Sequence, residues 1–402
     1  MFEPLYYLKT VFGYPAFRGQ QASIIQSVLS GQSTLVCMPT GAGKSLCYQI
    51  PALCLPGLTL VISPLIALMQ DQTDRLQALG VQANFLSSTQ HKMDQQNILR
   101  SLPKILYISP ERIQSDDFLN WLQKQSLSLF AFDEAHCISE WGHDFRPSYR
   151  DVCKLIERFP RITKMALTAT ATTRTQADIM EVLRFNNPHQ FIGSYNRPNI
   201  AYSLTPKVKA SQQLIHFIQR RHHGHSGLIY CRSRQNVMAL TQWLNQNHLK
   251  TLPYHAGLPR QIRSEHQKLF LRNPTLTMVA TIAFGMGIDK SNIRFVVHWD
   301  CPKSPEGYYQ ETGRAGRDGS PAEALLFIGQ HDIEKQHPLS EYIQEEKCRR
   351  HWLLKYFGET SPTYCGNCDV CQPDMKYWGQ IRKNFHKSAP WNTTTTQKKG
   401  RI

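Results

Sequence analysis

The sequence has no run of apolar residues near the roughly 18 that a membrane-spanning helix requires. It also has no N-terminal stretch that joins a basic flank, an apolar segment and a small-residue cleavage site, which is the pattern of a secretory signal. We find no repeat of fixed period. These absences argue against an integral membrane protein and against a secreted one, so we expect a cytoplasmic protein without a membrane partner.

Acidic residues are scarce relative to basic ones, with 30 Asp and Glu against 46 Lys and Arg and a net charge of +16. A basic balance of this size suits a polyanionic partner such as nucleic acid, although solubility is the simpler explanation. Part of the excess is local, since residues 374–402 carry seven basic residues and one acidic residue. This tail has no hydrophobic periodicity and is expected to be disordered, either contacting phosphates or inert.

The 402-residue chain is long enough for two or three domains. Apolar runs alternate with helical patterns from Thr34 to about Thr170, and the alternation resumes after a polar, proline-bearing stretch at residues 195–207. Continuous apolar strands separated by helices indicate parallel sheets covered on both faces. We therefore predict an α/β protein with two tandem domains. The expected strands are TLVCM, LTLVIS, KILYIS, LSLFAFDE and KMALTAT, then GLIYC, TMVATIAF, IRFVVHWD and EALLFI.

Residues 33–52 place an apolar run before a glycine-rich turn and a segment that can be helical. Backbone N–H groups in such a turn, with the positive end of the following helix, form a nest for phosphate oxygens. Lys44 would reach the β- and γ-phosphates, and Ser45 would bind Mg²⁺. The first glycine of the usual pattern is missing, because Met38 stands there. The residues expected to hold ATP in this loop are Thr40, Gly41, Ala42, Gly43, Lys44 and Ser45. The alternative is a glycine-rich turn with an incidental lysine.

A second nucleotide motif follows about 90 residues later, where Asp133 and Glu134 end an apolar run. The carboxyl end of a buried strand is where open α/β sheets bind ligands. Asp133 would hold Mg²⁺, directly or through water, and Glu134 would orient and deprotonate the water that attacks the γ-phosphate.

A third motif, residues 313–319, lies in the second expected domain, which has no phosphate loop. An arginine delivered from a facing domain would neutralise charge on the transferred phosphoryl group and would register domain closure. Arg317 is the first candidate for this role and Arg314 the second. A basic surface turn remains the alternative for either one alone.

With these motifs, the chain resembles the RecQ family of superfamily 2 DNA helicases, of the DEAH type, over roughly residues 8–373. The resemblance implies two RecA-like domains, a zinc-binding subdomain and a tail. The expected boundaries are 1–200, 201–336, 337–373 and 374–402. Family members usually continue into a winged-helix domain. The 29 residues after Pro373 have neither the length nor the apolar pattern for one, which puts duplex binding and unwinding efficiency in question.

The resemblance also assigns nucleotide contacts outside the phosphate loop. Tyr14 and Arg18 would sandwich the adenine and Gln21 would bond its edge, because a ring and a guanidinium plane suit stacking. Packing at the N-terminus is the alternative for Tyr14. Gly285 and Asp289 match a motif that lies between the nucleotide and the DNA.

Residues 137–147 follow the acidic pair and mix aromatic with charged residues. They resemble the family's aromatic-rich loop, which senses single-stranded DNA. Trp141 and Phe145 offer faces for unstacked bases, and Arg146 offers charge for phosphate. Thr168 belongs to the motif that couples ATP state to DNA. The family commonly has Gln where Glu140 stands, so an acid here is expected to weaken DNA contact or alter the coupling.

Eleven cysteines without a secretory signal favour reduced thiols or metal over disulfides. Four of them are set apart in a C-x₁₆-C-x₂-C-x₂-C pattern that suits tetrahedral coordination. They are Cys348, Cys365, Cys368 and Cys371. Spacing alone leaves an iron–sulfur cluster open. Zn²⁺ is the ion that the family resemblance implies.

The resemblance implies an ATP- and Mg²⁺-dependent DNA helicase that moves 3′ to 5′ on single-stranded and partly duplex DNA, acts in recombination and repair, and works as a monomer. An RNA-directed DEAH ATPase is one alternative. A DNA-stimulated ATPase, or a nucleic-acid-binding or annealing protein with little unwinding, is another.

Overall fold

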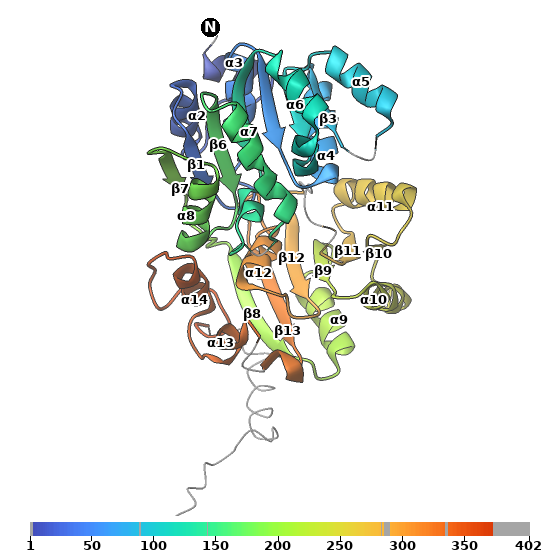
Figure 1. Cartoon of the computed structure of the whole chain (residues 1–402). Coiled ribbons are helices and arrows are strands. Elements are labelled where there is room, and N and C mark those ends of the chain that lie inside the picture. Colours follow the sequence, from blue (N-terminus) through green and yellow to red (C-terminus); the bar gives the residue numbers. More distant parts are fainter. Residues whose placement is uncertain are drawn as a thin grey trace, which may run out of the picture.

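The computed structural model describes residues 3–87, 90–142, 144–282, 284, 290–333 and 337–372. Two β-sheets, one above the other in Figure 1, form the centres of two RecA-like domains. The strands of both sheets pair in parallel within the described residues. The predicted α/β class with two tandem parallel-sheet domains and a small cysteine-bearing subdomain is therefore confirmed.

The first sheet has the strand order β3-β4-β2-β5-β6-β1-β7. Its strands are β1 (Thr34–Cys37), β2 (Leu58–Ile62), β3 (Ala83–Leu86), β4 (Ile105–Ile108), β5 (Leu127–Phe132), β6 (Thr163–Thr168) and β7 (His189–Ile192). The α-helices of this part of the chain are α1 (Pro4–Thr10), α2 (Gln21–Leu29), α3 (Leu46–Cys54), α4 (Ile66–Ala78), α5 (Lys92–Arg100), α6 (Asp116–Gln123), α7 (Val152–Arg158) and α8 (Thr173–Val182). Three short 3₁₀ helices accompany them: η1 (Pro110–Gln114), η2 (Ala135–Ile138) and η3 (Pro147–Asp151).

The second sheet has the strand order β10-β11-β9-β12-β13-β8. Its strands are β8 (Ile200–Pro206), β9 (Ser226–Tyr230), β10 (Thr251–Tyr254), β11 (Thr277–Ala280), β12 (Ile293–His298) and β13 (Ala322–Ile328). The helices here are α9 (Ala210–Arg221), α10 (Arg234–Gln246), α11 (Arg260–Arg272) and α12 (Pro305–Thr312). The chain continues through η4 (Gln330–Ile333), α13 (Ser340–Gln344) and α14 (Arg349–Tyr356).

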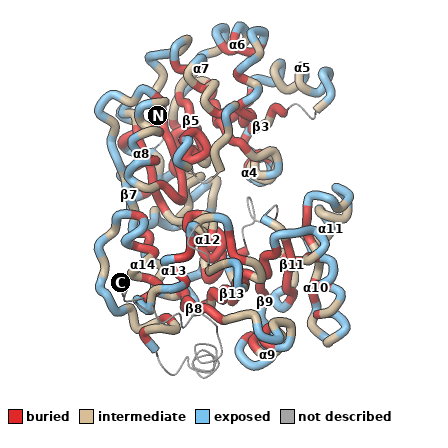
Figure 2. The backbone as a smooth tube through the Cα atoms, turned by 60° about the horizontal axis from the view of Figure 1, so that its bottom comes forward, coloured by how far each residue is buried: buried red, intermediate tan, exposed pale blue. Residues whose placement is uncertain are grey.

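The central strands are buried on both faces, as Figure 2 shows in red. In β1 the side chains alternate between the faces: Leu35 joins the apolar cluster that contains Phe130, while Val36 joins the one that contains Tyr48. Both faces of the sheet must then be covered, and helices cover them. This explains why the strands read as continuous apolar runs rather than alternating ones.

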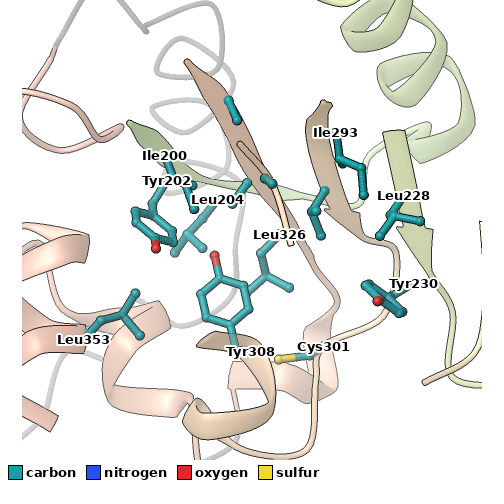
Figure 3. Close-up of a cluster of buried hydrophobic side chains, with 14 of the residues drawn as sticks. Ile200, Tyr202, Leu204, Leu228, Tyr230, Ile293, Cys301, Tyr308, Leu326 and Leu353 are labelled. Atoms are coloured by element: carbon teal, nitrogen blue, oxygen red, sulfur yellow. The ribbon is translucent and has the colours of Figure 1, made fainter. Parts of the chain in front are cut away.

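Four strands lie outside the expected set: β3, β7, β8 and β10. The difference with most consequence concerns residues 195–207, which the sequence pattern indicates as a polar segment between the two domains. They contain β8, an edge strand of the second sheet whose first six residues are buried. Helix α14 covers this strand. Leu353 of α14 packs in the same cluster as Tyr202 of β8, and both are labelled in Figure 3.

The cysteine-bearing subdomain is attached to β8 and to the segment between the sheets. Cys368 forms an isolated bridge with Tyr202, and the Asp369 carboxylate accepts from the Leu204 N–H at 3.0 Å. Glu359, just after α14, accepts from the Ser194 hydroxyl at 2.5 Å and from the Tyr195 N–H at 2.7 Å. The subdomain therefore contacts both the second sheet and the connection that leads to it.

Tyr149 joins the carboxyl ends of two neighbouring strands of the first sheet, β2 and β5. The buried Tyr149 hydroxyl lies 2.8 Å from the carbonyl oxygen of Ile62, at the end of β2, and 2.6 Å from that of Asp133, just after β5.

No helix in the described part of the chain has the length and apolar character needed to cross a bilayer.

We predict that Tyr149→Phe lowers the melting temperature of the first domain, because a buried hydroxyl that serves two carbonyl groups is lost. The expected cost is about 1–2 kcal/mol of unfolding free energy. Thermal denaturation followed by circular dichroism measures it. Tyr364→Phe, at a tyrosine that is 63% exposed, is the matched control and should leave the transition unchanged. Equal transitions in both variants would contradict a structural role for the Tyr149 hydroxyl.

Candidate active site

A cavity of about 700 Å³ lies between the two domains. The first domain lines it with the phosphate loop, Asp133 and Glu134, and the second domain lines it with Arg314 and Arg317. The three predicted nucleotide motifs, separated by up to some 270 residues in sequence, therefore meet in one space.

The phosphate loop joins β1 to α3, as the sequence predicted. Gly43 has φ +77°, and a Cβ there would lie 2.4 Å from the Gln21 side-chain nitrogen, so the position requires glycine. The Lys44 ammonium group donates to the carbonyl oxygen of Met38 at 3.0 Å, and burial lowers its pKa although Glu134 and Asp133 oppose the shift. The buried Thr40 hydroxyl has no hydrogen-bond partner among the described residues. An unpartnered hydroxyl and a partly buried ammonium group fit phosphate oxygens.

The expected adenine contacts lie at one end of this cavity. The Arg18 guanidinium carbon is 5.9 Å from the centre of the Tyr14 ring, which is somewhat less than the two stacking spacings of about 3.5 Å each that an inserted base needs. Gln21 is buried, and its amide bridges the Arg18 N–H, at 2.9 Å, and the carbonyl oxygen of Gly43, at 3.1 Å. The structure thus shows Gln21 bracing the phosphate loop, and its contact with adenine stays a prediction.

The acidic pair follows β5 as predicted. Burial, and then the charge of Glu134, raise the pKa of Asp133, while Lys44 opposes the shift. Glu134 has a left-handed backbone with φ +48°, which is uncommon for a residue other than glycine and costs on the order of 1–3 kcal/mol. Two adjacent carboxylates supply the oxygen ligands that a hard divalent cation such as Mg²⁺ prefers.

A short chain of contacts leads away from Glu134. The Nδ1 atom of His136 lies 3.4 Å from a Glu134 carboxylate oxygen and 2.9 Å from the Thr168 hydroxyl, which in turn contacts the carbonyl oxygen of Thr170 at 3.1 Å. Thr168 has no exposed surface, so its side chain presents nothing that DNA could contact directly. Its predicted part in coupling ATP to DNA stays a prediction, in which Thr168 would act indirectly, through its contact with His136.

The arginine motif reaches the phosphate loop from the second domain. A Cβ placed on Gly41 would lie 3.1 Å from the side chain of Arg317, while Arg314 is 5% exposed at the floor of the cavity. Arg197 organises this loop: its guanidinium group donates to the carbonyl oxygens of Gly313, at 2.9 Å, and Ala315, at 2.8 Å, and more weakly to that of Thr40, at 3.5 Å. Sequence reasoning missed Arg197, since an arginine in a linker has no motif of its own.

The aromatic-rich loop lies beside η2 and α8. Trp141 is 53% exposed, with the guanidinium carbon of Arg174, in α8, 3.1 Å from its ring centre. Gly142 is required in the loop, because a Cβ there would lie 2.0 Å from the carbonyl oxygen of His136. Sequence reasoning also missed Arg174, which connects the loop to the helix that follows the Thr168 motif.

Two charged residues of this loop are already paired within the protein. Glu140 contacts Arg150 at 2.7 Å, which explains how an acid is accommodated at this position. Arg146 donates to the carbonyl oxygen of Pro64 at 2.6 Å and to Asp144 at 3.1 Å, and Phe145 beside it is half-exposed. The phosphate contact of Arg146 and the base contact of Phe145 stay predictions. Gly285 and Asp289 fall outside the described residues.

The four set-apart cysteines come together, with their sulfur atoms within 4.8 Å of one another. Three of the sulfurs accept hydrogen bonds from backbone N–H groups. The Asn367 N–H donates to the Cys365 sulfur at 3.3 Å, and the Cys365 N–H donates to the Cys371 sulfur at 3.3 Å. The His351 N–H donates to the Cys348 sulfur at 3.5 Å. N–H groups directed at sulfur stabilise thiolates, and a tetrahedral set of four thiolates fits Zn²⁺.

A cavity shared by two RecA-like domains, with an acidic pair on one and arginines on the other, has the architecture of a two-domain helicase core. Family comparisons agree: residues 18–179 match the DEAD/DEAH box helicase family, residues 206–319 match the helicase conserved C-terminal domain, and residues 328–372 match the RecQ zinc-binding family. The chain belongs to the RecQ family.

Two curated relatives illustrate the match. The ATP-dependent DNA helicase RecQ of Haemophilus influenzae is 49% identical over 93% of this chain and 64% of its own length. That of Bacillus subtilis is 41% identical over 90% of this chain and 65% of its own. The chain thus spans less than two thirds of either relative. The structure of the DEAD-box helicase Mss116 bound to ssRNA and UDP-BeF has the same fold, with a TM-score of 0.70, 16% identity and coverage of 84% of this chain and 76% of Mss116.

We predict that the purified protein, dialysed against metal-free buffer, is colourless and retains one tightly held zinc ion, measured by elemental analysis. Cys368→Ser should lose most of this zinc and melt at a lower temperature, because binding energy at such a site is also folding energy. Cys153→Ser, at a cysteine outside the cluster, should retain the zinc. Brown protein containing iron would refute the zinc assignment in favour of an iron–sulfur cluster.

Proposed function

We propose that this protein is an ATP-dependent DNA helicase that moves 3′ to 5′ along single-stranded DNA. The observation that carries the proposal is the single cavity to which both domains contribute charged groups, because hydrolysis there can be linked to relative motion of the domains. The basic balance of +16 and the names of the relatives support DNA as the partner.

The side chains of the cavity can divide the chemistry of phosphoryl transfer among them. Lys44 would leave the carbonyl oxygen of Met38 to neutralise the β- and γ-phosphates, and Glu134 would orient and deprotonate the attacking water. Ser45 and Asp133 would hold Mg²⁺, which supplies positive charge between the phosphates. Arg317, with Arg314 beside it, would neutralise charge developing on the transferred group when the domains close.

A continuous set of contacts can link this chemistry to DNA. It runs from Glu134 through His136 to Thr168, then to the segment that begins α8, where Arg174 stacks on Trp141. Bases that lie on the exposed part of Trp141 would shift Arg174 and, through it, the segment from Thr168. We infer that DNA binding is sensed along this path.

The DNA substrates we propose are single-stranded and partly duplex, and the proposed cellular roles are recombination and repair. These and the monomeric state rest on the family resemblance. The second domain makes a further contact with the first, from Arg260 in α11 to Gln70 in α4 at 3.2 Å. Such a contact would have to break and re-form in each cycle of opening and closing.

Unwinding of duplexes with a 3′ or a 5′ single-stranded tail tests activity and polarity together. We expect ATP-dependent separation of the 3′-tailed duplex and little of the other. Lys44→Ala should abolish unwinding and DNA-stimulated ATP hydrolysis while leaving DNA binding mostly intact, since Lys44 faces phosphate rather than DNA.

Three results would contradict the proposal. Preference for the 5′ tail would reverse the polarity. ATP hydrolysis stimulated more by single-stranded RNA than by DNA would point to an RNA-directed enzyme. Wild-type turnover in Lys44→Ala would overturn the assignment of the nucleotide site.

We predict that Trp141→Ala lowers the affinity for single-stranded DNA and the DNA-stimulated ATPase rate by about 5- to 150-fold, the value of one to three kcal/mol of base stacking. The basal rate should fall less, because Trp141 lies outside the nucleotide cavity. Steady-state hydrolysis with and without DNA measures both. Trp141→Phe, which keeps a ring, should restore part of the stimulation. Equal losses of basal and stimulated rates would indicate a packing role instead.

A further inference from the structure

A second group of metal-binding side chains lies in the second domain, away from the nucleotide cavity and separate from the four-cysteine cluster. It consists of Cys301, just after β12, Asp332 in η4 and His337 before α13, whose donor atoms all lie within 4.8 Å of one another. Figure 3 shows Cys301 beside Tyr308, at the end of the buried cluster of this domain. The matched family segments span these positions, and the proposed helicase chemistry does not use the three residues.

The donor set has the chemistry of a borderline divalent cation. Zn²⁺ and Co²⁺ bind thiolate, imidazole and carboxylate together, with bonds of about 2.0–2.3 Å. Donor atoms of a tetrahedral site are then about 3.3–3.8 Å apart. The Cys301 sulfur lies 3.9 Å from the Nδ1 atom of His337, so coordination requires the donors to approach by only a few tenths of an ångström to about one ångström.

Burial distinguishes this group from a chance cluster on the surface. Cys301 is 3% exposed and the Asp332 side chain 13% exposed. The backbone N–H of Gly329 fixes the Asp332 carboxylate through a hydrogen bond of 2.7 Å to one oxygen, which leaves the other oxygen for a cation. The ligands therefore come from segments that the fold already holds in place.

Two neighbours compete with a cation here. The Leu339 N–H lies 3.2 Å from the same Nδ1 atom of His337, at the long end of hydrogen bonding, so coordination would replace a weak contact. Arg232 lies 4.0 Å from Asp332 and donates to the carbonyl oxygen of Cys301 at 3.3 Å. Its side chain is 60% exposed and can turn into solvent, which makes it a charge that a cation would displace.

We propose that Cys301, Asp332 and His337 form a second metal site, for a zinc-class divalent ion with water as the fourth ligand. The ion joins the end of β12 to the chain on both sides of residues 334–336, where the second sheet leads into α13. The site fastens the beginning of the cysteine-bearing subdomain to the sheet, whereas the four-cysteine site fastens its end.

Titration of the full chain with Co²⁺ tests the proposal, with zinc retained in the four-cysteine cluster and its content checked before and after. Wild type should bind one Co²⁺ with a thiolate-to-cobalt charge-transfer band, and Zn²⁺ added in excess of the four-cysteine zinc should raise its melting temperature. Cys301→Ser should lose the band and the thermal shift. His337→Gln should bind at least tenfold more weakly. Cys153→Ser, the matched loss of a thiol elsewhere, should behave as wild type.

Arg232→Ala separates metal binding from simple packing. Removing a positive charge 4.0 Å from a ligand should tighten Co²⁺ binding by about threefold to thirtyfold. A structural hydrogen-bond cluster predicts no such gain. Equal numbers of bound Co²⁺ in wild type and Cys301→Ser, or a Co²⁺ spectrum without a thiolate band, would overturn the proposal. Circular dichroism confirms that each variant is folded, so that loss of binding is assigned to the ligand.

Discussion

Two adjacent carboxylates and one lysine lie close together at the end of β5, and the arrangement of the cavity depends on this concentration of charge. Burial raises the pKa of Asp133 and lowers that of Lys44, so each group is held away from its preferred ionisation. Phosphate and a divalent cation would relieve both shifts, because each group would then face an opposite charge. The charges of the first domain would therefore be balanced only when such a ligand is bound, and the arginines of the second domain line the same cavity.

The positions of Arg314 and Arg317 in the cavity depend on hydrogen bonds to backbone carbonyl groups of their own loop. Arg197 takes up carbonyl oxygens of the 313–316 loop and so fixes the path from which Arg314 and Arg317 project. On the opposite side, Tyr149 fixes the strand ends that present Asp133. Both supports are single side chains that reach across several strands or loops. The side chains that line the cavity from the two domains are therefore positioned by two hydrogen-bonding groups, the buried Tyr149 hydroxyl and the partly buried Arg197 guanidinium.

The sequence allowed the fold class, the three nucleotide motifs and the four-cysteine cluster to be predicted, because each depends on local spacing. Strands β7 and β8 were not predicted, since β7 is a mostly exposed edge strand and β8 is buried by pairing with β13 and by packing against α14. Arg197 and Arg174 act through contacts with segments distant in sequence, which no local pattern records. The same holds for Cys301, which lies among scattered core cysteines until the fold brings Asp332 and His337 beside it.

Tyr195 lies in the connection between the two domains and contacts both of them as well as the cysteine-bearing subdomain. Domain 1 holds the chain up to Gly193, whose N–H bonds the carbonyl oxygen of Cys37 at 2.7 Å, while Arg197 is bound to the second domain. Residues 194–196 therefore form the short connection between the part of the chain held by the first sheet and the part held mainly by the second. The Glu359 carboxylate accepts hydrogen bonds from Ser194 and Tyr195, and Phe357 stacks on the Tyr195 ring. The small cysteine-bearing subdomain is thus attached to the connection between the domains, and any change in the angle between the two sheets would have to be accommodated by these contacts.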